Sequence, residues 1–210
     1  MKNGVPIYAI DFEGSKGAGV VEFGAVGIFE GEIFFSETSI CAPRAKIDFR
    51  SEKLTGISNA EASKHPPFES FAETFISMRQ NGLFAAHNFS AEDSMLRSHI
   101  PSPGRVKNFL DSSETLSWAP WLDSIAFAKF LDGALQSLKL SSAASALGIT
   151  AELDARAAAL CPAGRAKWHC ALYDALACAL IIKKALEKIE DFGELKKIAA
   201  GDAQQYFGIA

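Results

Sequence analysis

Three short apolar runs, separated by glycine-containing turns, restrict the fold of this chain more than any other feature. They cover residues 5–11, 20–29 and 32–40, and residues 14–19 and 30–31 separate them. The runs are rich in β-branched and aromatic residues, which favour strands, and the glycine-containing connections are short enough to reverse the chain. The sequence therefore predicts an antiparallel meander at the start of the chain.

Helical and strand-like patterns alternate after the meander. Residues 68–78 place three phenylalanines and a methionine at helical spacing, and Asn81-Gly82 ends that pattern. Further helices are predicted at residues 90–100, 120–131, 141–147 and 170–186, and further strands at residues 83–86 and 108–111. We interpret residues 1–186 as one α/β domain, a mixed five-stranded sheet flanked by helices, and residues 187–210 as a C-terminal tail or appended helix.

Charge and composition limit the partners of the chain. A formal net charge of −4 argues against a broad basic surface for nucleic acid, because Lys and Arg contacts dominate such binding, so any contact should be local. The longest apolar run, residues 175–182, is far shorter than the roughly 20 residues of a membrane span, and the first residues lack the pattern of an export signal. The four cysteines lack C-x-x-C spacing. We expect a cytoplasmic protein with free thiols and no membrane role.

Asp11 and Glu13 stand at the end of the first predicted strand. A strand has a period of two, so both carboxylates point to one face and Phe12 points to the other. Apolar residues lead into the pair, which places these acids at the edge of a core, where a carboxylate needs a partner. Such a pair suits a hard divalent cation, and a solvated strand end is the alternative.

Asp93 lies in a predicted helix that follows a short apolar strand ending at His87-Asn88. Ser90 and Asp93 have the spacing of a capping box, which accounts for Asp93 without a catalytic role. The alternative is that the sheet edge at His87 brings Asp93 toward the first acidic pair. The sequence is compatible with both interpretations.

His169 and Asp174 are five positions apart, which is about 140° on an α-helix, so two helical side chains at this spacing diverge. They can meet only if His169 lies on the loop before the helix, and the proline and glycine in residues 161–167 indicate such a loop. A mobile histidine beside a fixed acid is one arrangement for a general base near a metal ion. A capping histidine with an exposed aspartate is the alternative.

Together these motifs resemble the DEDDh branch of the DnaQ-like 3'-5' exonuclease superfamily, whose signature is Asp-x-Glu, an Asp in a helix after His-Asn, and His-x4-Asp. The matching segments are AIDFEG with Asp11 and Glu13, AAHNFSAEDSML with Asp93, and WHCALYDALACAL with His169 and Asp174. VVEFGAVGI, LTGIS, LDSIAFAKFL and SLKLSSAASALGI extend the resemblance over about residues 5–186. The resemblance implies an RNase H-like fold and an exonuclease domain at residues 1–186.

A hydrolase that releases nucleoside 5'-monophosphates from the 3' end of single-stranded or frayed DNA or RNA is the activity that this resemblance implies. Asp11, Glu13, Asp93 and Asp174 would hold two Mg²⁺ or Mn²⁺ ions, for which an all-oxygen ligand set is suited. The two ions would activate a water molecule and stabilise the leaving 3' oxygen. His169 would take the proton of that water.

Substrate contacts are predicted at Phe12, Gly14, Ile57, His87 and Asn88. The resemblance puts Ile57 where an apolar side chain wedges against the terminal base, with a buried loop anchor as the alternative, and Phe12 has a core role as its alternative. The loop after the Asp-x-Glu motif lacks the Thr-Thr-Gly that often follows it in the family, so the contacts that those family residues make with the terminal nucleotide are not carried over. Basic residues that either hold the phosphate backbone or are simply solvated are Arg44, Lys46, Arg50, Lys53, Arg165 and Lys167.

Two other functions compete with a stand-alone trimming enzyme, which could be a homodimer. One is a catalytically silent exonuclease-like module that binds a polymerase or an RNA-processing partner. The other is a proofreading module of a polymerase assembly that docks through its tail, where residues 204–207 faintly resemble a sliding-clamp peptide. The preference for DNA or RNA is left open, because contacts to the 2'-hydroxyl decide it.

Overall fold

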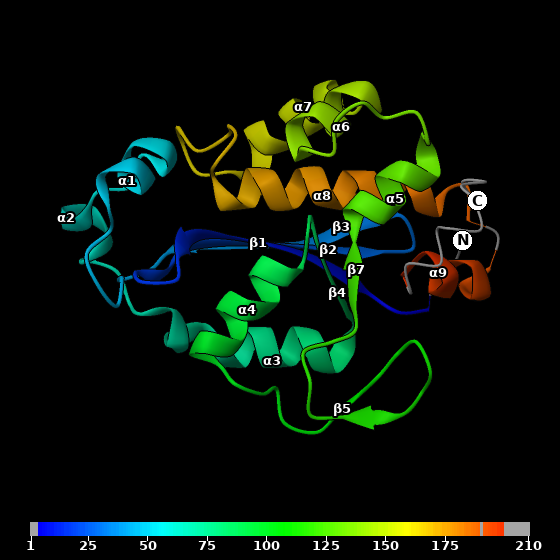
Figure 1. The fold of residues 1–210 in the computed structure, drawn as a ribbon, viewed down its shortest axis with the longest axis horizontal. Coiled ribbons are helices and arrows are strands. Elements are labelled where there is room, and N and C mark those ends of the chain that lie inside the picture. Colours follow the sequence, from blue (N-terminus) through cyan, green and yellow to red (C-terminus); the bar gives the residue numbers. More distant parts are fainter. Residues whose placement is uncertain (1–3, 190, 200–210) are drawn as a thin grey trace.

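A mixed five-stranded sheet forms the centre of the computed structural model, which describes residues 4–189 and 191–199 (Figure 1). The strand order is β3-β2-β1-β4-β7. The predicted meander is present as β1 (Ile7–Ser15), β2 (Gly19–Phe29) and β3 (Glu32–Ile40), which pair antiparallel. β4 (Leu83–Ala86) then pairs parallel to β1, and β7 (Trp121–Asp123) pairs parallel to β4. The predicted α/β class and the five-stranded mixed sheet are confirmed.

Helices cover both faces of this sheet (Figure 1). One face carries α5 (Ser124–Leu131), α6 (Leu140–Ala146), α7 (Thr150–Leu160) and the long α8 (Ala171–Leu186). The other face carries the 3-10 helix η1 (Phe68–Phe71), α3 (Ala72–Asn81) and α4 (Ser90–His99). α1 (Phe49–Thr55) and α2 (Asn59–Ala62) lie beyond one end of the sheet.

Alternating residues of β1 divide the hydrophobic core into two layers. Ile7 and Ala9 pack in the layer that contains α8, whereas Tyr8, Ile10 and Phe12 pack in the layer that contains α3. This alternation follows from the period of two along a strand. It also means that Asp11 and Glu13, which continue the series of Ile7 and Ala9, point toward α8.

The fifth strand begins later in the chain than predicted. Residues 108–111, predicted as a strand, instead form a turn at the tip of a small hairpin between β5 (Val106–Lys107) and β6 (Glu114–Thr115). Asn108 accepts a hydrogen bond from the backbone of Leu110 at 3.0 Å and Asp111 from that of Ser113 at 2.8 Å, and such local bonds compete with a strand. β7 takes the place at the sheet edge.

Asp123 explains why the helix predicted at residues 120–131 is shorter in the structure. Its side chain accepts a hydrogen bond from the backbone of Ile125 at 2.9 Å and caps α5, which therefore begins at Ser124. The residues before this cap extend the sheet as β7 instead. α1, α2 and α7 were not predicted.

The described part of the predicted tail continues as α9 (Phe192–Ala199). Leu195 and Ile198 of α9 are buried in the core layer that contains α8. Residues 204–207, the segment that faintly resembles a sliding-clamp peptide, lie outside the described residues. The division into residues 1–186 and 187–210 stays a prediction.

Cys41, Cys161, Cys170 and Cys178 are free thiols, as predicted. No helix among the residues that the structure describes is long and apolar enough to cross a membrane.

Candidate active site

Asp11 and Glu13 lie at the carboxyl end of β1, on its α8 side. In the antiparallel ladder Asp11 is opposite Gly24 and Glu13 is opposite Glu22 of β2. Phe12, between them, is 7% exposed and lies in the opposite core layer. The alternation of the strand thus presents two carboxylates to the start of α8.

Gly24 allows α8 to come close to the sheet at this point. A Cβ atom on Gly24 would lie 2.3 Å from the carbonyl oxygen of Ala171, the first residue of α8, which is much closer than van der Waals contact. The first turn of α8 therefore packs directly on β2. That approach brings Asp174, in this first turn, to the carboxylates of Asp11 and Glu13, whose pKa values its charge raises.

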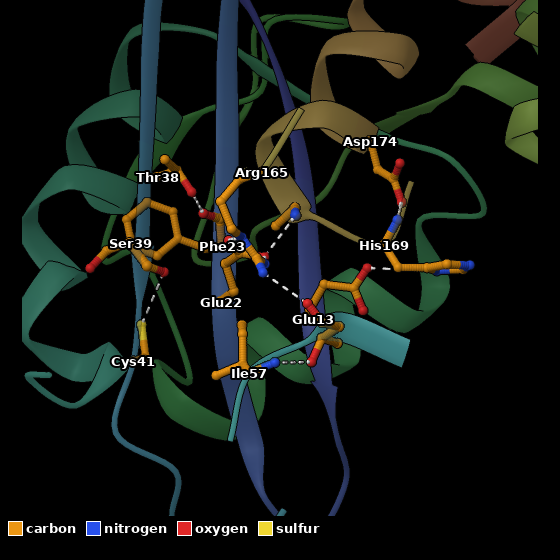
Figure 2. Close-up of polar contacts among 12 residues, drawn as sticks. Glu13, Glu22, Phe23, Thr38, Ser39, Cys41, Ile57, Arg165, His169 and Asp174 are labelled. Carbon is orange, nitrogen blue, oxygen red and sulfur yellow. Dashed lines mark hydrogen bonds and ion pairs between the residues drawn. The ribbon is translucent and has the colours of Figure 1, made fainter. Parts of the chain in front are cut away.

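His169 lies on the loop before α8, as its spacing from Asp174 predicted. Its backbone has a φ of 63°, and its N–H donates to Asp174 Oδ2 at 3.2 Å. The imidazole is 52% exposed, with Nδ1 4.0 Å from Glu13 Oε1 (Figure 2). Potential ligand atoms of Glu13, His169 and Asp174 all lie within 4.8 Å of one another.

The fourth acid of this cluster is Glu92 in the structure, and Asp93 lies outside it. Asp93 accepts hydrogen bonds from Arg97 Nε at 2.6 Å and from Trp121 Nε1 at 2.9 Å, so both its oxygens are bound elsewhere. Glu92 is 8% exposed, and its Oε2 is buried without a hydrogen-bond partner. The charge of Glu92 raises the pKa values of Asp11 and Glu13, which places its carboxylate near theirs. The structure therefore corrects the predicted position of this acid by one residue.

Crowding and burial favour the protonated form of all four clustered acids. Burial first, and then repulsion by Asp174, raises the pKa of Glu13 to about 8. Burial is also the main cause that raises the pKa of Asp174 to about 7, that of Glu92 to about 7, and that of Asp11 well above its usual range. Such acids either hold protons or need a compensating cation.

The donor set of this cluster fits divalent cations that prefer oxygen ligands. Glu92 Oε2 and Asp174 Oδ1 are buried side-chain oxygens without a hydrogen-bond partner. Buried carboxylate oxygens are rarely left unpaired, and coordination to a cation would satisfy them. Asp11, Glu13, Glu92 and Asp174 are accordingly the residues that could hold Mg²⁺ or Mn²⁺.

His87 and Asn88 make bonds within the protein. His87 contacts Ser124 Oγ through Nδ1 at 2.7 Å and Leu138 O through Nε2 at 2.6 Å. Asn88 has a φ of 63°, and its N–H donates to Asp123 Oδ1 at 3.0 Å. Both residues thus connect the end of β4 to the start of α5 and to the loop before α6. Their predicted contact with substrate has no support in these bonds.

Phe12 and Ile57 are core residues in the structure. The Phe12 ring packs edge-on against Phe68 with 5.3 Å between ring centroids. Ile57 is 1% exposed in a small cluster with Val21 and Ile47, which corresponds to the buried-anchor alternative. Neither side chain offers a free face to a base, so the structure does not support the predicted stacking contacts.

Gly14 lies at an irregularity in the β1–β2 ladder and has a φ of 154°. A Cβ atom there would lie 2.1 Å from the carbonyl oxygen of Gly19, so only glycine fits this turn. Its contact with substrate stays a prediction.

The basic residues near the site fall into two groups. Arg44 binds Glu69 and the Ser98 carbonyl, and Arg165 binds Glu22, so both guanidinium groups are engaged within the protein. The other four basic residues have exposed side chains that form no ion pair within residues 4–189 and 191–199: Lys46, Arg50, Lys53 and Lys167.

Solved structures that are similar to this chain include exonucleases. Exonuclease X in complex with 5' overhanging duplex DNA aligns with a TM-score of 0.63 and 18% identity, over 92% of this chain and 99% of that protein. The nuclease domain of 3'hExo, a DEDDh family member bound to rAMP, aligns with a TM-score of 0.60 and 16% identity, over 87% of this chain and 92% of that domain. This chain has the fold of the DnaQ-like exonucleases. The predicted RNase H-like fold is thereby confirmed.

Curated proteins are also similar to this chain in sequence, whereas no protein-family model matches it. DNA polymerase III PolC-type of Clostridium perfringens is 27% identical over 177 residues, which is 84% of this chain and 11% of that protein. The 3'-5' exonuclease DinG of Bacillus subtilis is 29% identical over 89 residues, which is 42% of this chain and 10% of that protein. The chain thus spans about a tenth of the length of these relatives.

Proposed function

We propose that this protein is a metal-dependent 3'-5' exonuclease that releases nucleoside 5'-monophosphates from single-stranded or frayed nucleic acid. The observation that carries the proposal is the cluster of Asp11, Glu13, Glu92 and Asp174 at the carboxyl end of β1, with His169 beside Glu13 and Asp174. This convergence occurs in a fold shared with 3'-5' exonucleases.

The four carboxylates supply the negative charge that draws divalent cations to the scissile phosphate. Bound there, two such cations would offset the charge of the phosphodiester and promote attack by water. Asp11 and Glu13 are held rigidly by the β1–β2 ladder, and Asp174 by the first turn of α8. Rigid ligands are expected to hold the cations in one geometry from one turnover to the next.

His169 is the group of the site that can take a proton from the attacking water. Its ring is half exposed, while its backbone is fixed by the hydrogen bond to Asp174. Histidine is the side chain that most often acts as a general base in enzymes. We assign His169 as the general base and expect the imidazolium to discharge its proton to solvent.

The substrate is proposed to be a strand with a free 3' end. Solved structures that share the fold include complexes with duplex DNA and, under the description "3'-end specific recognition of histone mRNA stem-loop by 3'-exonuclease", with RNA. The experiment below therefore tests both DNA and RNA.

An association with a polymerase is a second proposal, favoured by the similarity to PolC-type DNA polymerase III. In that role the chain would remove misincorporated nucleotides within a larger assembly. Co-purification of the tagged chain with a polymerase would support this role. A free monomer or homodimer that degrades oligonucleotides at full rate would support a stand-alone enzyme.

Digestion of 5'-labelled single-stranded DNA and RNA of one sequence tests the proposed activity. We expect a ladder that shortens from the 3' end with Mg²⁺ or Mn²⁺ and stops with EDTA. Asp11→Asn controls for contaminating nucleases, because it removes one of the proposed ligands. If wild-type protein leaves both oligonucleotides intact with every cation, a silent partner-binding module becomes the better interpretation.

A further inference from the structure

Arg165 connects the loop that carries His169 to two other segments of the chain. Its Nε donates to Glu22 Oε1 at 2.9 Å, and its Nη2 forms a second bond to Glu22 Oε2 (Figure 2). Its Nη1 donates to the Thr55 carbonyl at 2.8 Å. The Arg165 side chain is 16% exposed and that of Glu22 is 4% exposed. A bidentate pair between a guanidinium and a carboxylate is strong and fixes the relative orientation of both groups.

Glu22 holds the His169 loop at both ends. Besides the two bonds from Arg165, its Oε2 accepts the backbone N–H of Ala171 at 2.9 Å. Arg165 lies four residues before His169 and Ala171 lies two residues after it. One buried carboxylate of β2 thus fixes both sides of the short segment that contains the histidine.

The backbone of His169 requires such support. Its φ of 63° lies in the left-handed region, which residues other than glycine seldom adopt. A strained backbone persists only where the surrounding structure holds it. The N–H bond to Asp174 and the two anchors on Glu22 provide that restraint.

The third bond of Arg165 reaches the segment that contains Ile57. Thr55 ends α1, its carbonyl accepts from Arg165, and its Oγ1 accepts the Ile57 N–H at 3.2 Å. The same guanidinium therefore connects the His169 loop to the end of α1.

Two other roles of this pair are disfavoured by its bonds. Glu22 lies opposite Glu13 in the β ladder, which would suit an additional metal ligand, but both its oxygens are taken by Arg165 and Ala171. Arg165 could in principle bind a substrate phosphate, but its Nε, Nη1 and Nη2 all donate to protein acceptors.

We infer that Arg165 and Glu22 are positioning residues, which hold the 165–171 segment so that the His169 imidazole stays beside Glu13 and Asp174. The inference rests on the proposed exonuclease function, since it assigns the pair a role through His169. It predicts that the contribution of Arg165 to the rate depends on the presence of His169.

A double-mutant cycle tests this dependence. kcat and KM are measured on a 5'-labelled single strand at saturating Mg²⁺ for wild type, Arg165→Met, His169→Ala and the double variant. We expect Arg165→Met to lower kcat by roughly 10- to 100-fold with less than about a threefold change in KM, because small misplacement of a catalytic group has effects of this size. In the His169→Ala background the same substitution should lower kcat less than about threefold.

Arg44→Met is the matched control variant. Arg44 also binds one glutamate, Glu69, and one backbone carbonyl, that of Ser98, but it does not contact the His169 loop. We expect Arg44→Met to change kcat less than about threefold. Arg165→Lys, which keeps the charge but loses the bidentate geometry, should recover part of the rate that Arg165→Met loses.

A measurement that needs no activity separates this inference from the proposed function. In NMR spectra of the metal-free protein, the ring signals of His169 should shift or broaden in Arg165→Met and in Glu22→Gln, and stay unchanged in Arg44→Met. Equal losses of kcat with and without His169, or His169 signals that do not respond to Arg165→Met, would overturn the inference. An inactive wild-type protein whose His169 signals do respond would instead contradict the proposed function alone.

Discussion

Glu92 and Asp93 are neighbours on α4, yet their carboxylates lie in different surroundings. Glu92 is 8% exposed and contributes to the acidic cluster at the end of β1. Asp93 binds Arg97 and Trp121 instead. Successive residues of a helix differ by about 100° in direction, so only one of the two acids can face the sheet edge.

The first prediction follows from this difference. Glu92→Gln keeps the shape of the side chain but weakens its affinity for a cation. It should lower kcat/KM by about 10- to 100-fold or more, because the loss of a residue that only supports a metal ligand already has an effect of this size. Asp93→Asn should keep kcat/KM within about threefold of wild type and destabilise the fold by about 1 kcal/mol, through weaker bonds to Arg97 and Trp121. Steady-state kinetics and urea unfolding measure both effects. The reverse order of activities would restore Asp93 as the fourth acid.

The spacing of the apolar residues along α4 could have identified Glu92 from the sequence. Leu96 and Ile100 follow Glu92 by four and eight residues, and both are buried with it along one side of α4 and its end. Asp93 has Arg97 at the same spacing, which is typical of an exposed ion pair. The capping-box alternative is wrong, because Phe89 is the N-cap of α4 and no side chain caps it; Asp93 instead bonds to Arg97 and Trp121. The family signature calls for an aspartate in this helix and so predicts Asp93, whereas the acid that joins the cluster is the glutamate one residue earlier.

The second prediction concerns the stability of the metal-free protein as a function of pH. Glu13 has a folded-state pKa of about 8, against an ordinary value of 4.5 in the unfolded chain. Between these values the folded state binds more protons than the unfolded state, so the free energy of unfolding falls as pH rises through this window. Asp174 and Glu92, with pKa values raised to about 7, act in the same direction.

In EDTA, the melting temperature should therefore fall by several degrees between pH 6 and pH 8.5. In a domain of this size, a loss of about 1 kcal/mol in the free energy of unfolding lowers the melting temperature by about 2–4 °C. Mg²⁺ should stabilise the protein more at pH 8.5 than at pH 6, because the cation replaces protons. Differential scanning calorimetry with and without Mg²⁺ measures both effects, and Glu92→Gln should show the smaller dependence on pH. A melting temperature in EDTA that rises over this range would contradict the raised pKa values.

The meander was predictable because its local signals agree, whereas the β7 region was not. β1, β2 and β3 combine strand-forming residues with glycine turns. The sequence predicts one helix at residues 120–131, which begin with Pro120, but Asp123 caps α5 and the preceding residues pair with β4. Pairing with a distant strand is a tertiary effect that overrides a local pattern. The bonds of Arg165 to Glu22 and Thr55 are also between distant segments, so the sequence could show the basic residue but not its partners.

His169 provides the third prediction. His169→Ala should lower kcat by about 10²- to 10⁴-fold, the usual contribution of a general base. Its backbone N–H still donates to Asp174 in this variant, so stabilisation by Mg²⁺ should be retained. Single-turnover rates over pH 6–9 and calorimetric titration with Mn²⁺ measure the two properties. An unchanged pH–rate profile in His169→Ala would remove the general-base assignment.

The last prediction is that the solvent-exposed side of α1 binds the single-stranded substrate. Phe49 and Leu54 are 78% and 51% exposed, and Arg50 and Lys53 are exposed beside them. At about 100° per residue these four side chains lie within an arc of about 140°, while Thr55 is buried on the opposite side. An aromatic ring among cations is the usual composition of a surface that binds single strands by stacking and by phosphate contacts.

Phe49→Ala and Lys53→Ala should therefore raise KM for a single strand of about 20 nucleotides by roughly 5- to 100-fold with little change in kcat, as expected for the loss of one stacked base or phosphate contact. A dinucleotide, which offers fewer bases and phosphates to this surface, should show a smaller change in KM. Phe34→Ala is the matched control, because Phe34 is also an exposed phenylalanine, at 53%, but lies on β3 near its turn with β2. If Phe34→Ala raised KM as much as Phe49→Ala, or if the dinucleotide were affected equally, the strand would not pass over α1.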